Sequence, residues 1–195
     1  SVQTLGFVSA INSDKTGTLT MNQMTAVELV DLTDRYTITG SGYGLDGQIN
    51  HAAGTSKSIE GAVLPYILAS DAKLVDGKVV GDPTEGALLV LGHKAGLDIE
   101  QTREKFPRLA TLPFDPSYKL MATFHPAVDD SGKKVVRCFV KGAAPAVMSH
   151  ATSVIAGGTS TAINDDVSKK AQAEVARMGA LGQRVMAAAT RDIDA

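Results

Sequence analysis

A short stretch near the N-terminus of this 195-residue chain combines a carboxylate with hydroxyl groups, a glycine and a lysine. It reads Ser13-Asp14-Lys15-Thr16-Gly17-Thr18-Leu19-Thr20 and follows an apolar stretch, residues 5–11, that is typical of a strand. Asp14 therefore lies at the carboxyl end of an expected strand, where open α/β sheets bind ligands. The small residues after it allow backbone N–H groups and threonine oxygens to approach a phosphoryl group, and Lys15 adds positive charge. In this setting the Asp14 carboxylate can act as a nucleophile and form an aspartyl-phosphate.

The run from Asp14 to Thr20, DKTGTLT, is identical to the phosphorylation motif of the P-type ATPases, and on this ground the chain resembles that family. The resemblance implies that Asp14 is phosphorylated, that Lys15 and Thr16 complete the catalytic motif, and that Asp14 and Thr16 are ligands of Mg²⁺. The competing interpretation is an aspartate that caps a helix in a polar turn. For a match of this length we prefer the catalytic interpretation.

Thr16 stands where phosphatases of the related haloacid dehalogenase lineage carry a second aspartate as general acid and base. A threonine hydroxyl has no titratable proton near neutral pH and cannot activate water efficiently. A phosphate on Asp14 should therefore persist until another domain supplies a base. A pump needs such an intermediate and a phosphatase does not, so the phosphatase remains the weaker alternative.

The bulk composition is that of an ordinary globular protein. Hydrophobic residues make up 44% and charged residues 21% of the chain. The net charge of −2 and the absence of tryptophan argue against a nucleic-acid surface. The single Cys138 lies in an apolar run and is expected in the core of a protein from a reducing compartment. No stretch has the length of a transmembrane helix or the pattern of a signal peptide. The resemblance to the P-type ATPases therefore implies a cytosolic part of a membrane protein.

The rest of the chain alternates between strand-like and helical patterns. Strands are expected at residues 25–30, 35–39, 78–80, 108–112, 119–125, 134–140 and 184–189. Helices are expected at 56–73, at 82 to 92 or 96 with Asp82 as N-cap, at 143–150, and from Asp165 or Asp166 to 178. Residues 40–55 are expected to form a glycine-rich loop. Because the strands follow one another in hairpins more often than in βαβ units, the pattern predicts a mainly antiparallel sheet flanked by helices.

Four further stretches resemble the nucleotide-binding domain of the type II pumps in the same family. They are Gly81-Asp82-Pro83-Thr84-Glu85-Gly86-Ala87-Leu88, Phe114 with Lys119 and Met121, Lys141-Gly142-Ala143, and Gln183-Arg184-Val185 with Ala189-Thr190-Arg191-Asp192. The resemblance implies that Phe114 stacks on adenine, that Glu85, Lys119 and Lys141 line the adenine pocket, and that Arg184 meets the phosphate chain. Gly142 would let the backbone approach the ligand. An aromatic face with lysine and arginine nearby is a plausible purine-nucleotide site on physical grounds as well.

Each of these residues also has an ordinary structural interpretation. Phe114 could be a core residue, Glu85 a capping-box residue, and Lys141 and Arg184 solvated charges at strand ends. Their occurrence together, in the order of the family, favours the binding interpretation.

Two other patterns point to different chemistry and are set aside. Residues 42–47 fit G-x-G-x-x-G after an expected strand, but the polar stretch that follows starts no helix, so we interpret them as a turn. The four histidines, His51, His93, His125 and His150, lack the spacing of zinc ligands.

The sequence thus predicts an α/β (α+β) fold with a mainly antiparallel sheet. Residues 1–22 would begin a Rossmann-like phosphorylation domain and its hinge, 23–190 would form the nucleotide-binding domain, and 191–195 the return hinge. The expected function is that of the ATP-binding cytosolic domain of a cation-transporting ATPase in the plasma membrane, which presents the γ-phosphate of ATP to Asp14 and uses Mg²⁺. Its partners would be the remaining phosphorylation domain, the actuator domain and the transmembrane helices. The fragment alone is expected to be a monomer without activity, and a module that only binds nucleotide remains an alternative.

Overall fold

The computed structural model describes residues 20–54, 59–156 and 159–194. The helices within these ranges are α2 (Glu60–Leu68), α3 (Pro83–Lys94), α4 (Ile99–Lys105), α5 (Ala144–His150) and α6 (Asp165–Ala180). The strands are β1 (Glu28–Val30), β2 (Arg35–Ile38), β3 (Ile49–Ala53), β4 (Lys73–Val75), β5 (Lys78–Val80), β6 (Ala110–Asp115), β7 (Leu120–Val128), β8 (Lys134–Ala143), β9 (Ser153–Ala156), β10 (Thr159–Ala162) and β11 (Met186–Asp194). Among the described helices, none has both the length and the apolar character needed to cross a bilayer.

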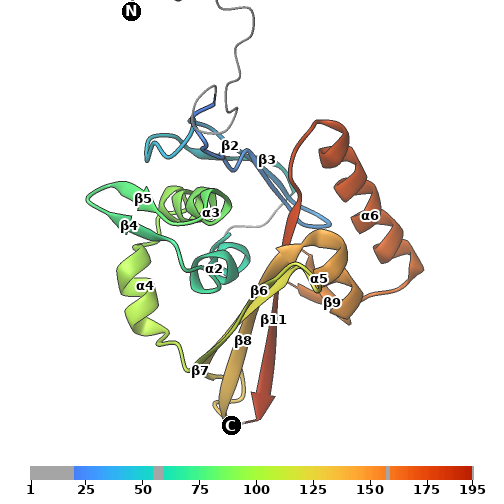
Figure 1. Cartoon of the computed structure of the whole chain (residues 1–195). Helices are drawn as coiled ribbons and strands as arrows, with labels where there is room; N and C mark the ends of the chain where they lie inside the picture. Colours follow the sequence, from blue (N-terminus) through green and yellow to red (C-terminus); the bar gives the residue numbers. More distant parts are fainter. Residues whose placement is uncertain (1–19, 55–58, 157–158, 195) are drawn as a thin grey trace, which may run out of the picture.

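Antiparallel pairing dominates the described fold, which confirms the predicted fold class. One sheet has the order β1-β2-β3, a second has the order β11-β8-β7-β6, and β4-β5 and β9-β10 form two hairpins. All of these pairs are antiparallel. Helices α2 and α3 lie between the β1-β2-β3 sheet and the four-stranded sheet, and α4 covers the side of α2 that is remote from α6 (Figure 1).

The core forms where α2 and α3 pack together. Its buried members come from β2, α2, α3, α4 and the segment between α2 and β4, and are Ile38, Val63, Ile67, Ala72, Leu89, Leu91 and Ile99. A smaller cluster of Leu68, Ala69 and Phe139 joins the end of α2 to β8. The ring of Phe139 also meets Phe106 and His125 edge-on. Helix α2 is thus the link between the two halves of the described fold.

Helix α2 ends at Leu68, five residues before the predicted end, and residues 73–75 form β4 instead of helix. Arginines from elsewhere in the chain bind the carbonyls at this end. The guanidinium of Arg103 donates to the carbonyl oxygens of Ile67, Ser70 and Ala72, and that of Arg108 donates to those of Leu68 and Ser70. These long-range bonds satisfy carbonyls that a continued helix would have used.

Several other elements differ from the predicted ones. Residues 49–53 of the predicted glycine-rich loop form β3, and α4 and the β9-β10 hairpin were not predicted. Helix α6 is capped by Asn164, whose side-chain oxygen accepts the N–H of Val167, and not by Asp165 or Asp166. The last strand, predicted at 184–189, runs to Asp194 because it pairs with β8 along its whole length. The predicted N-cap of α3 is correct, since the Asp82 carboxylate accepts the N–H groups of Thr84 and Glu85.

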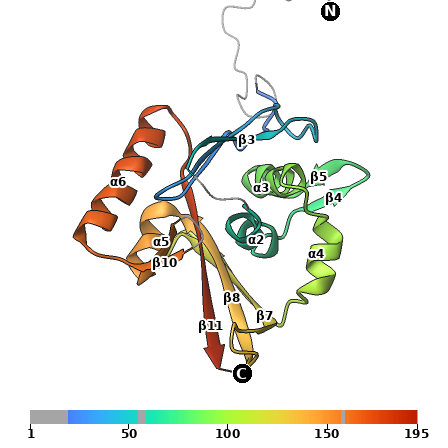
Figure 2. The same ribbon diagram turned by 180° about the vertical axis from the view of Figure 1, so that it is seen from behind.

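Helix α6 lies on the outside of the fold, as the view from behind shows (Figure 2), and buries none of its residues fully. Ion pairs attach it to the first sheet. Arg35 on β2 binds Glu174 at 2.9 Å, and Arg177 binds Glu28 on β1 at 2.6 Å. Because the basic partners of both pairs are about a third exposed, these contacts position the helix more than they stabilise it.

Candidate functional site

Glu85 occupies the first turn of α3, where the Asp82 cap fixes the helix start. Its carboxylate does not turn back to the cap. One oxygen accepts the backbone N–H groups of Asp71 and Ala72, both at 2.9 Å, and the other lies 2.8 Å from Nζ of Lys141. A carboxylate offers about four lone-pair sites, so these bonds use about three of them and leave one free. Glu85 therefore joins α3, the segment after α2 and β8 at one point.

Lys141 is a buried cation on β8, an inner strand, near one end of the four-stranded sheet. The residue is 4% exposed, and its register partners are Met121 on β7 and Ala188 on β11. Its ammonium group contacts the Glu85 carboxylate and the Met121 sulfur, the latter at 3.6 Å. Burying a charge at this depth requires a partner of opposite sign, and Glu85 supplies it.

Gly142 follows Lys141 and faces Leu120 across the sheet. A Cβ at this position would lie 2.5 Å from the carbonyl oxygen of Lys119 and 2.7 Å from Cα of Leu120. Only glycine therefore lets β8 approach the turn between β6 and β7 this closely. The glycine is required by backbone packing in the absence of any ligand.

We expect Gly142→Ala to lower the free energy of unfolding by about 1–3 kcal/mol, because backbone atoms must move to admit the methyl group. Gly179→Ala on α6 is the matched control, because nothing lies within 4 Å of the added carbon. There the free energy of unfolding should stay unchanged or rise by up to about 1 kcal/mol. Urea denaturation followed by circular dichroism measures both. An equal change in the free energy of unfolding in the two variants would contradict the packing argument.

Phe114 and Lys119 flank the β6-β7 turn at the same end of this sheet. The register pairs Asp115 with Leu120 and Leu120 with Gly142, so the turn adjoins the Lys141-Gly142 segment. The Asp115 carboxylate holds the turn by accepting the hydroxyl and the backbone N–H of Ser117, and these bonds lower the pKa of Asp115. Phe114 is 58% exposed, so its interpretation as a core residue is wrong. The Phe114 ring lies on β6 directly before this turn and is open to solvent, which suits it to stacking.

Arg184 comes from the loop between α6 and β11 and reaches the start of α3. Its guanidinium donates to the hydroxyl of Thr84 at 3.0 Å, and the residue is otherwise exposed. Thr84 lies beside Glu85 in the first helical turn, where backbone N–H groups carry partial positive charge. The guanidinium thus adds a positive charge next to the Glu85–Lys141 pair.

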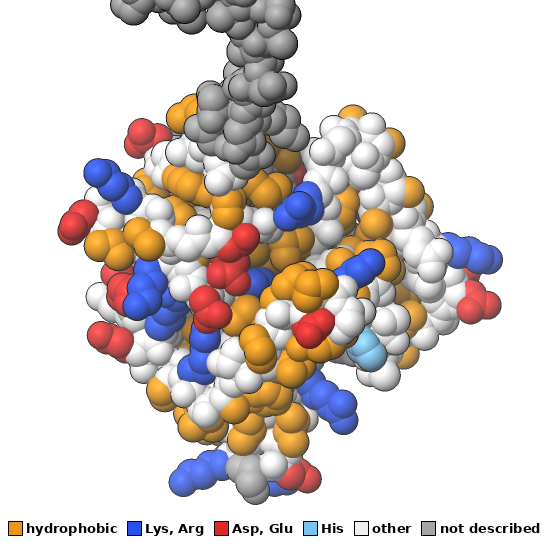
Figure 3. Space-filling model, viewed as in Figure 1, with side chains coloured by type: hydrophobic (Ala, Val, Ile, Leu, Met, Phe, Trp, Pro, Cys, Tyr) orange, Lys and Arg blue, Asp and Glu red, His pale blue; other side chains and the backbone are white. Residues whose placement is uncertain are grey.

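In the structure, Glu85 directly contacts Lys141, and Gly142 directly contacts Lys119. Arg184 contacts Thr84, the residue before Glu85. Phe114 directly precedes Asp115, whose register partner Leu120 also pairs with Gly142. In the space-filling view, acidic and hydrophobic side chains lie side by side near the centre of the face shown (Figure 3). Asp14, Lys15 and Thr16 lie outside the described residues. Met121 and Thr84 contact the predicted residues directly. Both stand inside the quoted motifs, which gave the only sequence signal for them.

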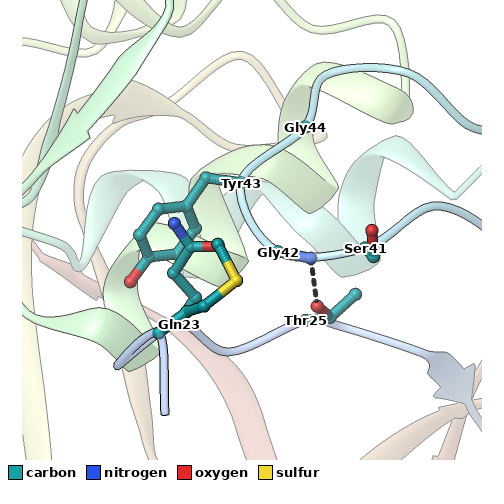
Figure 4. Close-up of a pocket in the computed structure, with 7 residues that line it drawn as sticks. Gln23, Thr25, Ser41, Gly42, Tyr43 and Gly44 are labelled. Carbon is teal, nitrogen blue, oxygen red and sulfur yellow. Dashed lines mark hydrogen bonds between the residues drawn. The ribbon is translucent and has the colours of Figure 1, made fainter. Parts of the chain in front are cut away.

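The glycine-rich residues 42–47 form a turn, as predicted, with the Gly44 N–H bonded to the Ser41 carbonyl. Strand β3 follows the loop, so the loop does not lead into a helix as a dinucleotide-binding G-x-G-x-x-G loop does. Figure 4 shows the shallow pocket beside it, where the Gly42 N–H donates to the Thr25 hydroxyl at 2.7 Å and Gln23 faces Tyr43. Within the described part of the chain, no group of three or more histidine, cysteine, aspartate or glutamate side chains is placed to hold a metal ion.

Residues 65–195, which contain every described site residue, match the family described as P-type ATPase, cytoplasmic domain N. The chain belongs to the P-type ATPases. The mouse calcium-transporting ATPase type 2C member 1 is 34% identical over 198 residues, covering 97% of this chain and 21% of that protein. The calcium-transporting ATPase 1 of Lactococcus lactis is 32% identical over 204 residues, covering 99% and 20%. The cation-transporting ATPase pma1 of Synechocystis is 34% identical over 169 residues, covering 80% and 18%.

The chain spans about a fifth of the length of these relatives. The motifs that are scattered along the sequence converge in space. Three of the four stretches that resemble the nucleotide-binding domain meet around Glu85 and Lys141, and the fourth places Arg184 at the start of α3.

Proposed function

We propose that this domain binds ATP for a cation-transporting P-type ATPase, with the adenine ring stacked on Phe114 beside the Glu85–Lys141 pair. The observation that supports this most is the exposed Phe114 ring at the sheet end where that pair is buried. Base stacking requires an uncovered aromatic ring, and the exposure of Phe114 meets this condition.

The charges of the other residues indicate which of them bind the phosphate chain and which bind the base. Lys141 is already neutralised by Glu85, so it contributes little net charge to the polyphosphate. Lys119 and Arg184 are exposed and would bind the phosphate oxygens instead. The free lone pair of Glu85 would accept a hydrogen bond from the exocyclic amino group of adenine. Guanine presents a carbonyl oxygen at that position and would be repelled.

This proposal predicts that the chain binds ATP in preference to GTP. One stacked base and a few exposed charges suggest a dissociation constant of roughly 0.1–1 mM, about 4 to 5.5 kcal/mol. Titration with each nucleotide, followed by ¹H–¹⁵N NMR, should shift the signals of Phe114, Lys119 and Gly142. An equal or stronger response to GTP would contradict the adenine pocket.

In the whole pump we propose that Asp14 attacks the γ-phosphorus of ATP, forming an aspartyl-phosphate while ADP leaves. Asp14 and Thr16 would hold the Mg²⁺ ion, whose charge stabilises the transferred phosphoryl group. We further propose that residues 1–22 belong to the phosphorylation domain, 23–190 to the nucleotide-binding domain and 191–195 to the return hinge. The remaining phosphorylation domain, the actuator domain and the transmembrane helices would be the partners, in the plasma membrane.

The chain by itself should not hydrolyse ATP at a useful rate, because positioning and metal-held charge provide most of phosphoryl-transfer catalysis. Phosphate release from purified chain, measured with and without Asp14→Asn, tests this expectation. A release rate that Asp14→Asn abolishes would show that the chain is a complete enzyme.

A further inference from the structure

The segment between α2 and β4 holds the Glu85 carboxylate of the proposed nucleotide site. One oxygen of Glu85 accepts the backbone N–H groups of Asp71 and Ala72, both at 2.9 Å. These two residues belong to no helix or strand, because α2 ends at Leu68 and β4 begins at Lys73. The direction of the two N–H groups therefore depends on contacts from other parts of the chain.

Two arginines bind the carbonyl groups of this segment. Arg103 comes from α4, and its guanidinium donates to the carbonyl oxygen of Ser70 at 3.1 Å and to that of Ala72 at 2.9 Å. Arg108 follows α4 in the chain and donates to the same Ser70 oxygen at 2.9 Å. It also forms an ion pair with the Asp71 carboxylate at 2.6 Å. Ser70 is only 1% exposed, so solvent does not replace either arginine there.

The contacts of both arginines and of Glu85 meet on one peptide unit. The Ser70 carbonyl and the Asp71 N–H belong to the same planar group, and this peptide is trans. In a trans peptide the C=O and the N–H point in opposite directions, so fixing one of them fixes the other. Arg103 and Arg108 bind the carbonyl on one side, and Glu85 accepts the N–H on the other. The positive charges, the peptide dipole and the carboxylate are therefore aligned, an arrangement in which each hydrogen bond strengthens the next.

We propose that Arg103 and Arg108 are positioning residues of the nucleotide site, which orient the Ser70–Asp71 peptide so that it holds Glu85 in place for adenine. The role for adenine rests on the proposed function, whereas the orientation of the peptide does not. Neither arginine is among the proposed contacts with ATP. Without them the peptide can rotate, and the free lone pair of Glu85 loses the fixed direction that a hydrogen bond to the amino group of adenine requires.

Amide hydrogen exchange of the 195-residue chain, followed by ¹H–¹⁵N NMR without nucleotide, tests the orientation of the peptide by itself. Arg108→Met is the variant to use, because Arg103 still binds the Ser70 carbonyl and the end of α2 should stay folded. The Asp71 amide should exchange about tenfold faster or more, the effect of one lost charged hydrogen bond on this peptide. The amide of Leu89, a buried residue of α3, reports unfolding of the whole domain and should change far less. An equal increase at Asp71 and Leu89, or no increase at Asp71, would overturn the proposal.

Titration with ATP and GTP tests what the orientation does for binding. In Arg108→Met the ATP affinity should fall about fivefold, the contribution of one hydrogen bond, while the GTP affinity stays within about twofold of the parent. Arg137→Met is the matched control. The Arg137 side chain is 29% exposed, against 31% for Arg108, and each has an aspartate partner at 2.6 Å, so the control should keep both affinities. Asp71→Asn removes the ion pair of Arg108 but leaves its carbonyl contacts, and should also keep the ATP affinity.

The two measurements distinguish failure of the positioning role from failure of the proposed function. If the parent chain does not bind ATP, the proposed function is wrong, and the exchange of the Asp71 amide still decides whether the arginines orient the peptide. An equal loss of ATP and GTP affinity in Arg108→Met would overturn the positioning role. The same conclusion would follow if Asp71→Asn bound ATP as weakly as Arg108→Met.

Discussion

Replacing Lys141 with methionine should lower the free energy of unfolding by about 3 kcal/mol or more, since it leaves a buried carboxylate without its counter-charge. The side chains of Lys141 and Glu85 are 5% and 14% exposed, so solvent cannot replace the missing partner. The two backbone N–H groups on Glu85 remain, and for this reason we expect the lower end of the range for broken buried pairs. Urea denaturation of the purified variant measures the change.

Two further variants show whether the loss comes from the charge. Lys134→Met changes an exposed lysine on the same strand and should leave the stability within about 0.5 kcal/mol of the parent. Adding Glu85→Gln to Lys141→Met should recover part of the loss, because the amide oxygen still accepts from Asp71 and Ala72 without a buried charge. If Lys141→Met unfolds at the same urea concentration as the parent, the pair does not stabilise the domain.

The expected loss of stability affects how ATP binding by Lys141 variants is interpreted. The resemblance to the family implies that Lys141 lines the adenine pocket, so its replacement is expected to weaken binding directly. Because the ammonium group also holds Glu85 and therefore the segment after α2, a loss of binding includes a loss of structure. Nucleotide affinity of these variants should be compared only under conditions where circular dichroism shows them folded.

Phe114→Ala should weaken ATP binding by roughly 5- to 150-fold, because a base–aromatic stack contributes about 1–3 kcal/mol. The same substitution should change the stability by no more than about 0.5 kcal/mol, since the ring is 58% exposed. Val128→Ala is the matched control. It removes another exposed apolar side chain, at the opposite end of β7, and should leave ATP affinity unchanged. Isothermal titration calorimetry and urea denaturation measure the two quantities.

The Phe114 experiment separates the pocket from the phosphorylation motif when Asp14→Ala is measured beside it. The γ-phosphate should not reach Asp14 in the chain alone, so Asp14→Ala should bind ATP as the parent does. If folded Phe114→Ala keeps its affinity while Asp14→Ala loses it, ATP binds at the motif and the proposed pocket is wrong.

Local patterns gave the fold class and most of the elements correctly. The N-cap at Asp82 with Pro83 after it predicted α3, and the alternating apolar residues of 119–125 and 134–140 predicted the central hairpin of the larger sheet. These features depend on interactions between neighbours in the chain or across one hairpin. Short polar strands such as β3 and β10 have no comparable pattern and were missed.

The sequence by itself determined the family, because unbroken motifs such as DKTGTLT and GDPTEGAL depend on residue identity and order alone. Only the tertiary structure decided what those residues contact. The end of α2 depends on Arg103 and Arg108, more than 30 residues away, and the charge of Glu85 depends on Lys141, 56 residues away. A buried charge pairs with an opposite charge that only folding brings close to it, and the neighbouring residues in the sequence do not indicate which residue that is. The same holds for Phe114, whose exposure follows from the edge position of β6 in the sheet.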